Sequence, residues 1–178
     1  MVGIAVITIG MLANQELIKR GEDNPGDEAK AKESAYALQM AEDNRLFKEV
    51  RASEEQGLYQ EAMAQVEDII KSYPEKPLSY VYFARLHFKE GELGESVINY
   101  RQAVEMEPDY VDKRTPLFIG DEIKQIVEEG REKFGREKEL KPEDNEVREA
   151  LKDIYYLQSR LAGGCESVSY THLTLPTN

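Results

Sequence analysis

Evenly spaced prolines constrain this chain more than any other feature of its sequence. Pro74, Pro108 and Pro142 lie 34 residues apart in a chain of 178 residues. Proline lacks the backbone N–H and its ring clashes with the preceding turn, so it ends a helix. Three evenly spaced helix ends predict three copies of one structural unit. Further positions repeat at the same spacing, namely Gly57 and Gly91, Ala62 and Ser96, Leu46 and Tyr80, and Ile69 and Ala103.

Each period has the pattern of two helices joined by a tight turn. Between Tyr80 and Lys89 apolar residues recur every three to four positions, which marks one face of a helix. Gly91 follows in "EGELG", and we expect it to cap that helix in the left-handed conformation. A second apolar stripe runs from Glu95 to Glu107. Three small residues on these stripes would let the two helices approach closely. These residues are Ala84, Ser96 and Ala103.

The segment "YVYFARLHFKEGELGESVINYRQAVEMEP" resembles a tetratricopeptide repeat, a helix–turn–helix unit with a period of about 34 residues. Tyr100, Ala103 and Pro108 match the pattern of the family. At other positions of the family pattern this chain has a different residue from the usual one. These residues are Tyr80, Phe83, Ala84, His87 and Ser96. The resemblance implies an all-α fold, in which antiparallel helix pairs stack into a right-handed α-solenoid with flanking capping helices.

The resemblance covers about residues 43–164. It is strong in residues 77–110, weaker in 43–76 and degenerate in 111–144, where Pro116 and Gly120 interrupt the expected first helix. Thr115 and Pro116 could instead begin a late helix, with Thr as its cap. Residues 145–162 form an amphipathic pattern that predicts either a closing helix or the first helix of a fourth unit.

The N-terminal residues 1–18 form an apolar segment. Val2 to Ala13 is shorter than the roughly 18 to 20 apolar residues that cross a bilayer. We expect a membrane anchor that has lost its first half; a short amphipathic or buried segment is the alternative. Residues 19–42 are expected to form a linker and an N-terminal capping helix. Lys19 and Arg20 favour repeats on the cytoplasmic side.

The C-terminal residues 165–178 change character abruptly. The part "VSYTHLTLPT" resembles a transposase-based sequencing adapter translated in frame. We therefore expect a disordered tail that is not native; an ordinary flexible terminus is the alternative.

Composition excludes several classes of function. The net charge of −12 and the interleaving of basic with acidic residues disfavour binding to nucleic acid. The only cysteine is Cys165 and the only histidines are His87 and His172, so no metal-site spacing occurs. Neither a cofactor nor an enzymatic activity is expected, because His87, the best catalytic candidate, lacks a nucleophile–base or paired-acid arrangement around it.

The resemblance implies that the first helices of successive units line a concave groove that binds a peptide. Two arginines and a lysine among aromatic residues could hold an acidic, partly apolar segment. Alternatively, Phe88 belongs to the core, and Arg51 and Arg85 pair with Glu54, Glu55 or other surface carboxylates. A self-associating structural scaffold is the second possible function. The expected groove residues are Phe47, Arg51, Val81, Tyr82, Arg85, Phe88 and Lys89.

Overall fold

The computed structural model describes residues 25–163, which divide into one unit ending at Ala41 and a second beginning at Glu42. The first unit is the N-terminal part of helix α2 (Pro25–Leu46). A helix was expected within residues 19–42, and its role as a cap stays a prediction. The predictions for residues 1–18 and 165–178 lie outside the described residues. No helix within residues 25–163 is long and apolar enough to cross a bilayer.

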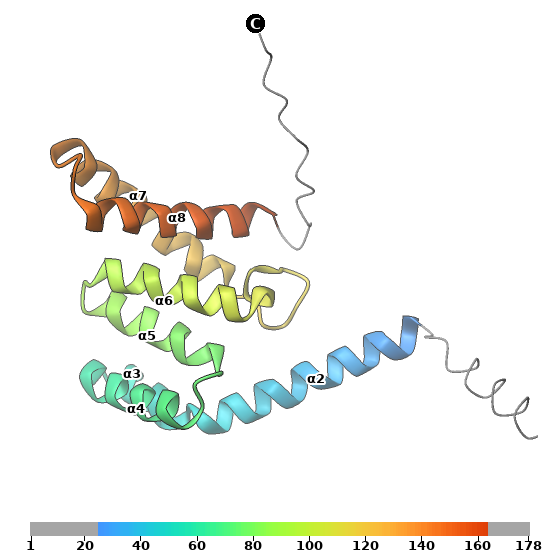
Figure 1. Ribbon diagram of the computed structural model, residues 1–178. Coiled ribbons are helices and arrows are strands. Elements are labelled where there is room, and N and C mark those ends of the chain that lie inside the picture. The colour runs from blue at the N-terminus through green and yellow to red at the C-terminus, as the bar shows by residue number, and fades with distance from the viewer. Residues whose placement is uncertain (1–24, 164–178) are drawn as a thin grey trace, which may run out of the picture. The chain divides into compact units, whose positions relative to one another are not determined.

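The second unit is helical, and no strand occurs in the part of the chain that the structure describes. The prediction of an all-α fold is therefore confirmed. Helices that follow one another in sequence pack as the pairs α3/α4, α5/α6 and α7/α8, which form three layers (Figure 1). The elements after α2 are α3 (Lys48–Glu55), α4 (Tyr59–Ser72), α5 (Pro77–Lys89), α6 (Leu93–Met106), the 3-10 helix η1 (Pro108–Val111), α7 (Gly120–Leu140) and α8 (Asn145–Gly163).

The turns of the first two pairs follow from local residue chemistry. Gly57 and Gly91 have φ angles of 74° and 82°, so the left-handed cap expected at Gly91 is confirmed and Gly57 repeats it. Glycine adopts this conformation without the steric clash that a Cβ causes. Pro74 lies in the turn between α4 and α5, and Pro108 begins η1 directly after α6. Both prolines stand where a helix has ended.

The third period departs from the expected helix–turn–helix pattern. A single helix, α7, runs through Gln125, the position that corresponds to the turn glycines Gly57 and Gly91. The late helix start at Thr115 is also not found, because Thr115 lies in the loop before α7 and its hydroxyl donates to the carbonyl oxygen of Asp109 at 2.9 Å. Helix α8, in contrast, closely matches the helix predicted over residues 145–162.

The lack of a side chain at Gly130 lets α8 pack closely against α7 at this point. A Cβ at Gly130 would lie 2.8 Å from Cδ1 of Ile154, which is fully buried in α8. The glycine therefore permits close helix contact, and it lies 34 residues after Ser96, at the position of a small residue in each period.

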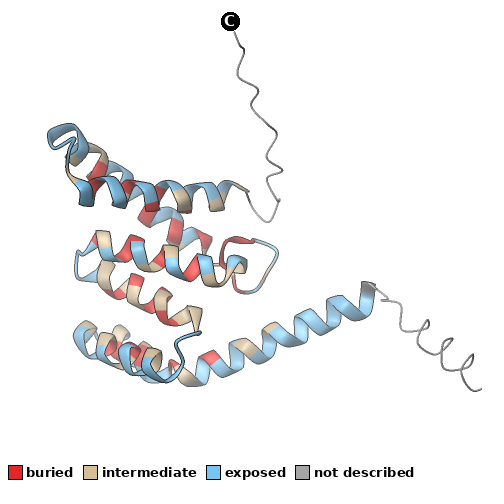
Figure 2. Cartoon of the chain, in the orientation of Figure 1, coloured by how far each residue is buried: buried red, intermediate tan, exposed pale blue. Residues whose placement is uncertain are grey.

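The core is centred on α5 and α6, which pack against both outer pairs. α5 contacts α4 on one side, while α6 contacts α7 and α8 on the other. Figure 2 shows buried residues all along these two helices. Their fully buried side chains include Val81, Ala84, Leu86, Val97, Ala103 and Val104.

We predict opposite effects for two glycine substitutions in α7. Gly130→Ala forces the added Cβ against Ile154, whereas a Cβ at Gly135 meets nothing within 4 Å. Overpacking costs about 1–3 kcal/mol, which outweighs the gain of roughly 1 kcal/mol from replacing a helical glycine by alanine. Urea denaturation should show a free energy of unfolding about 1 kcal/mol lower for Gly130→Ala and up to about 1 kcal/mol higher for Gly135→Ala.

Ile154→Val supplies the control, because it removes the Cδ1 atom that the new Cβ would meet. In that background Gly130→Ala should cost less stability than it does in the wild-type chain. An equal loss in both backgrounds would contradict the close-contact explanation.

Candidate functional site

Side chains from the first helix of each pair meet around one hollow of about 290 Å³. α3 contributes one of them, α5 contributes three and α7 contributes three, with one more from α6. Three of the seven residues expected from the sequence are among them. The lining residues are Glu54, Arg85, Phe88, Lys89, Tyr100, Glu122, Gln125 and Ile126.

Three other expected groove residues belong to the core. Phe47 and Val81 are 0% exposed and Tyr82 is 3% exposed, so their side chains cannot line an open groove. The rings of Phe47 and Tyr82 stack with their centroids 4.9 Å apart, and this contact joins α3/α4 to α5. The expectation for these three residues is therefore corrected: all three are core residues, and Phe47 and Tyr82 hold neighbouring pairs together.

Arg51 lies outside the hollow and stabilises the junction between α2 and α3. Its guanidinium donates to the side-chain Oδ1 of Asn44 at 2.5 Å and to the backbone carbonyl of Asn44 at 2.7 Å. Phe47 breaks the helical conformation here, yet its N–H still bonds the carbonyl of Asp43 at 2.9 Å. Arg51 thus pairs with neither Glu54 nor Glu55 and helps to close the end of α2.

Arg85 is already engaged by a carboxylate of the chain. Its Nε and its terminal nitrogen donate to the two carboxylate oxygens of Glu122 at 2.7 and 2.8 Å, which joins α5 to α7. The hydroxyl of Tyr100 donates to the same carboxylate at 3.1 Å. Burial by itself lowers the pKa of Arg85, but the hydrogen bonds and charge of Glu122 raise it above its ordinary value. Arg85 therefore pairs with a surface carboxylate, as the alternative interpretation expected.

Lys89 is the cation of the hollow that remains available. Its side chain is exposed, and no ion pair of Lys89 is formed within residues 25–163. Nearby, burial raises the pKa of Glu54, while the positive charge of Arg85 opposes that rise. With Phe88 beside it, Lys89 offers a partner one cation and part of an aromatic surface.

His87 lies in the last turn of α5 and does not line the hollow. Its Nδ1 lies 2.6 Å from a carboxylate oxygen of Glu92, and its ring lies 5.9 Å from that of Phe83. No cluster of three or more histidine, cysteine, aspartate or glutamate side chains that could hold a metal ion occurs in the described part of the chain. His87 thus has a packing position with a single acidic neighbour.

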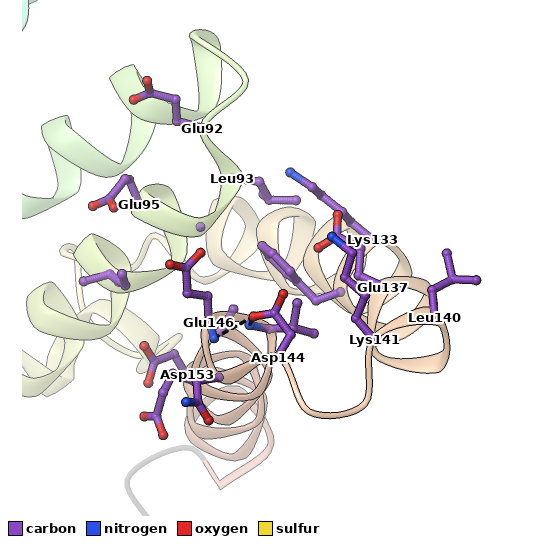
Figure 3. A pocket seen from close by; sticks show the side chains of 17 residues that line it. Glu92, Leu93, Glu95, Lys133, Glu137, Leu140, Lys141, Asp144, Glu146 and Asp153 are labelled. Atoms are coloured by element: carbon purple, nitrogen blue, oxygen red, sulfur yellow. Dashed lines mark hydrogen bonds between the residues drawn. The ribbon is translucent and has the colours of Figure 1, made fainter.

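A larger groove, of about 910 Å³, was missed by the sequence analysis. It lies where the start of α6, the end of α7 and the start of α8 come together (Figure 3). Leu140 is 82% exposed at its edge. The signal available in the sequence was a lone leucine at the end of the charged run "REKEL".

We predict that burial of three tyrosines makes the fold sensitive to alkaline pH. Burial raises the pKa of Tyr82, Tyr100 and Tyr110 above the ordinary value. The unfolded chain releases these protons near pH 10, while the folded chain retains them. Stability is thus fully present below about pH 10 and falls as the pH rises further. Urea denaturation from pH 8 to about pH 11 should show this decline.

Tyr100→Phe removes one of the three phenols and should make the decline shallower, by up to about 1.4 kcal/mol for each pH unit. Tyr155→Phe is the matched control, because that side chain is 54% exposed. If both variants declined with the same slope, burial of Tyr100 would not be the cause.

Comparison with known proteins adds no assignment to this geometry. The chain matches no protein-family model, no curated protein and no solved structure. The resemblance to tetratricopeptide repeats therefore rests on residues of the chain itself, above all on the period of its prolines and turn glycines. Any function must be argued from the surfaces described above.

Proposed function

We propose that this chain is a protein-binding module, an adaptor or scaffold of the tetratricopeptide type. In this proposal the three helix pairs form a right-handed solenoid, and the first helices line its concave side. The observation that carries the proposal is the hollow to which α3, α5 and α7 all contribute side chains. A partner segment bound there would contact all three layers at once.

The chemistry of the hollow favours an acidic, partly apolar partner segment. Lys89 offers an ammonium group without an ion pair in the described chain, and the ring of Phe88 is only partly buried beside it. Arg85 contributes less to binding a partner than an unpaired arginine would, because Glu122 already accepts two hydrogen bonds from its guanidinium. We therefore assign the carboxylate of the partner to Lys89 and its apolar side chain to Phe88.

A peptide-display selection on the immobilised full chain tests this assignment. Enriched peptides should carry Asp or Glu next to an aromatic or aliphatic residue. Lys89→Glu should weaken the best peptide by about tenfold, because it replaces an attractive charge by a repulsive one. Lys48→Glu is the matched control, since Lys48 is exposed on α3 and does not line the hollow.

Equal weakening by Lys89→Glu and Lys48→Glu would show that only net charge matters, and the assignment of the hollow would then be wrong. A selection that enriches no peptide on the wild-type chain would count against it in the same way.

The alternative function, a self-associating scaffold, makes a different prediction for solution behaviour. A net charge of −12 repels further copies of the chain. Sedimentation velocity should therefore show a single monomeric species whose sedimentation coefficient does not rise with protein concentration. Assembly that increases with concentration and is unchanged by Lys89→Glu would favour the scaffold. Tethering to a membrane through residues 1–18 stays a prediction from the sequence.

A further inference from the structure

We propose that the large groove between α6, α7 and α8 is a second docking site, and that its occupant is a basic amphipathic segment of another protein. The groove shares no lining residue with the hollow of α3, α5 and α7. Its volume of about 910 Å³ accommodates several large side chains. The proposal does not depend on whether the hollow binds a partner.

The floor of the groove is apolar and its edges carry exposed aliphatic side chains. Leu93, Phe134 and Val147 are largely buried in the floor, at 7%, 8% and 5% exposure. At the edges, Ile98 is 49% exposed and Leu140 is 82% exposed. In Figure 3 Leu140 extends from the end of α7, away from the protein. Aliphatic side chains left open around an apolar floor provide anchors for an apolar face of a partner.

Negative charge surrounds this apolar floor. Seven carboxylate side chains and two lysines line the groove. Much of this charge has a role in the fold, because four carboxylates are engaged and two more lie where a helix N-terminus favours negative charge. The four engaged groups are Glu92 with His87, Asp153 with Arg101, Glu149 with Lys152, and Asp144, which accepts from backbone N–H groups of α8. The other two, in the first turns of α6 and α8, are Glu95 and Glu146.

Glu137 is the carboxylate that the fold leaves unexplained. It lies in the last turn of α7, where the helix dipole disfavours negative charge. No partner of its side chain is present within residues 25–163, and its position is one helical turn before Leu140. An acidic and an apolar side chain thus stand together at the groove, with Lys133 and Lys141 four residues before and after Glu137. Glu137 and Leu140 are suited to a partner that is basic and apolar at once.

Charge complementarity decides between the possible occupants. A second copy of this chain carries a net charge of −12 and would be repelled by the acidic lining. A helix with apolar residues at positions i, i+4 and i+7 and lysine or arginine between them matches both the floor and the edge. We therefore commit to such a segment of a different protein.

A synthetic helix tests the proposal on the full chain. The probe is a fluorescein-labelled peptide of about 15 residues with leucines along one face and lysines elsewhere. Fluorescence anisotropy is measured at about 0.15 M salt, where screening limits unspecific attraction between charges. The wild-type chain should bind this peptide at least about fivefold more tightly than a scrambled peptide of the same composition or one with serine in place of leucine.

Two pairs of variants localise the binding. Glu137→Lys should weaken the leucine–lysine peptide by about fivefold or more, while Glu139→Lys, an equal charge change at an exposed position of α7 that does not line the groove, should leave it unchanged. Leu140→Ser should weaken it similarly, while Leu38→Ser, at a side chain that is 73% exposed, should not. Circular dichroism confirms that each variant keeps its helices.

Three outcomes would overturn the proposal. They are no binding of the probe, equal affinity for the scrambled peptide, and equal loss in the Glu137→Lys and Glu139→Lys variants, which would reveal a response to net charge alone. Because Lys89 lies outside this groove, none of these outcomes affects the assignment of the hollow.

Discussion

Burial of the α5/α6 pair on two sides is the constraint on which the rest of the structure depends. The outer pairs need one apolar side each, whereas the middle pair must be apolar toward both neighbours. Each fully buried valine or leucine contributes about 1.5–3 kcal/mol relative to its exposed state. An isolated helix pair buries too little surface to hold its shape. The small residues Ala84 and Ala103 belong to the same arrangement, because they keep the two middle helices close.

Charged contacts between helices of different pairs, and with the end of α2, accompany this apolar packing. Lys76, which precedes α5, bonds to the carboxylates of Glu42 at 2.7 Å and Asp43 at 3.2 Å. In α6, Arg101 bonds to Asp153 of α8 and lies 5.2 Å from the ring of Tyr156. A third contact of this kind, between α5 and α7, engages Arg85 and so removes a cation from the hollow. Contacts that align the layers thus limit what the hollow can offer a partner.

The two candidate binding surfaces arise from different parts of this architecture and have different chemistry. The hollow collects side chains from the first helix of each pair and offers Lys89 beside Phe88. The groove exists because α7 and α8 are longer than α6, so that their joined ends extend past its start. Its lining is acidic where the hollow presents an available cation. One chain could therefore bring together two partner segments of opposite charge, as an adaptor would.

The sequence by itself determined the features that depend on residues close together in the chain. The all-α class, the turns at Gly57 and Gly91 and the helix over residues 145–162 follow from local backbone chemistry and short-range periodicity, and the structure agrees with them. Three of the seven expected groove residues lie together in one hollow, and all three belong to the C-terminal part of α5.

Only the tertiary structure decided the features that depend on residues far apart. Phe47, Val81 and Tyr82 are core residues because other helices cover them, and a helical period cannot tell which neighbour covers which face. Gly130 serves close contact with Ile154 because α8 crosses α7 there. The acidic groove likewise needs the ends of three helices to meet. Such contacts join residues on different helices, so the local pattern of the chain cannot specify them.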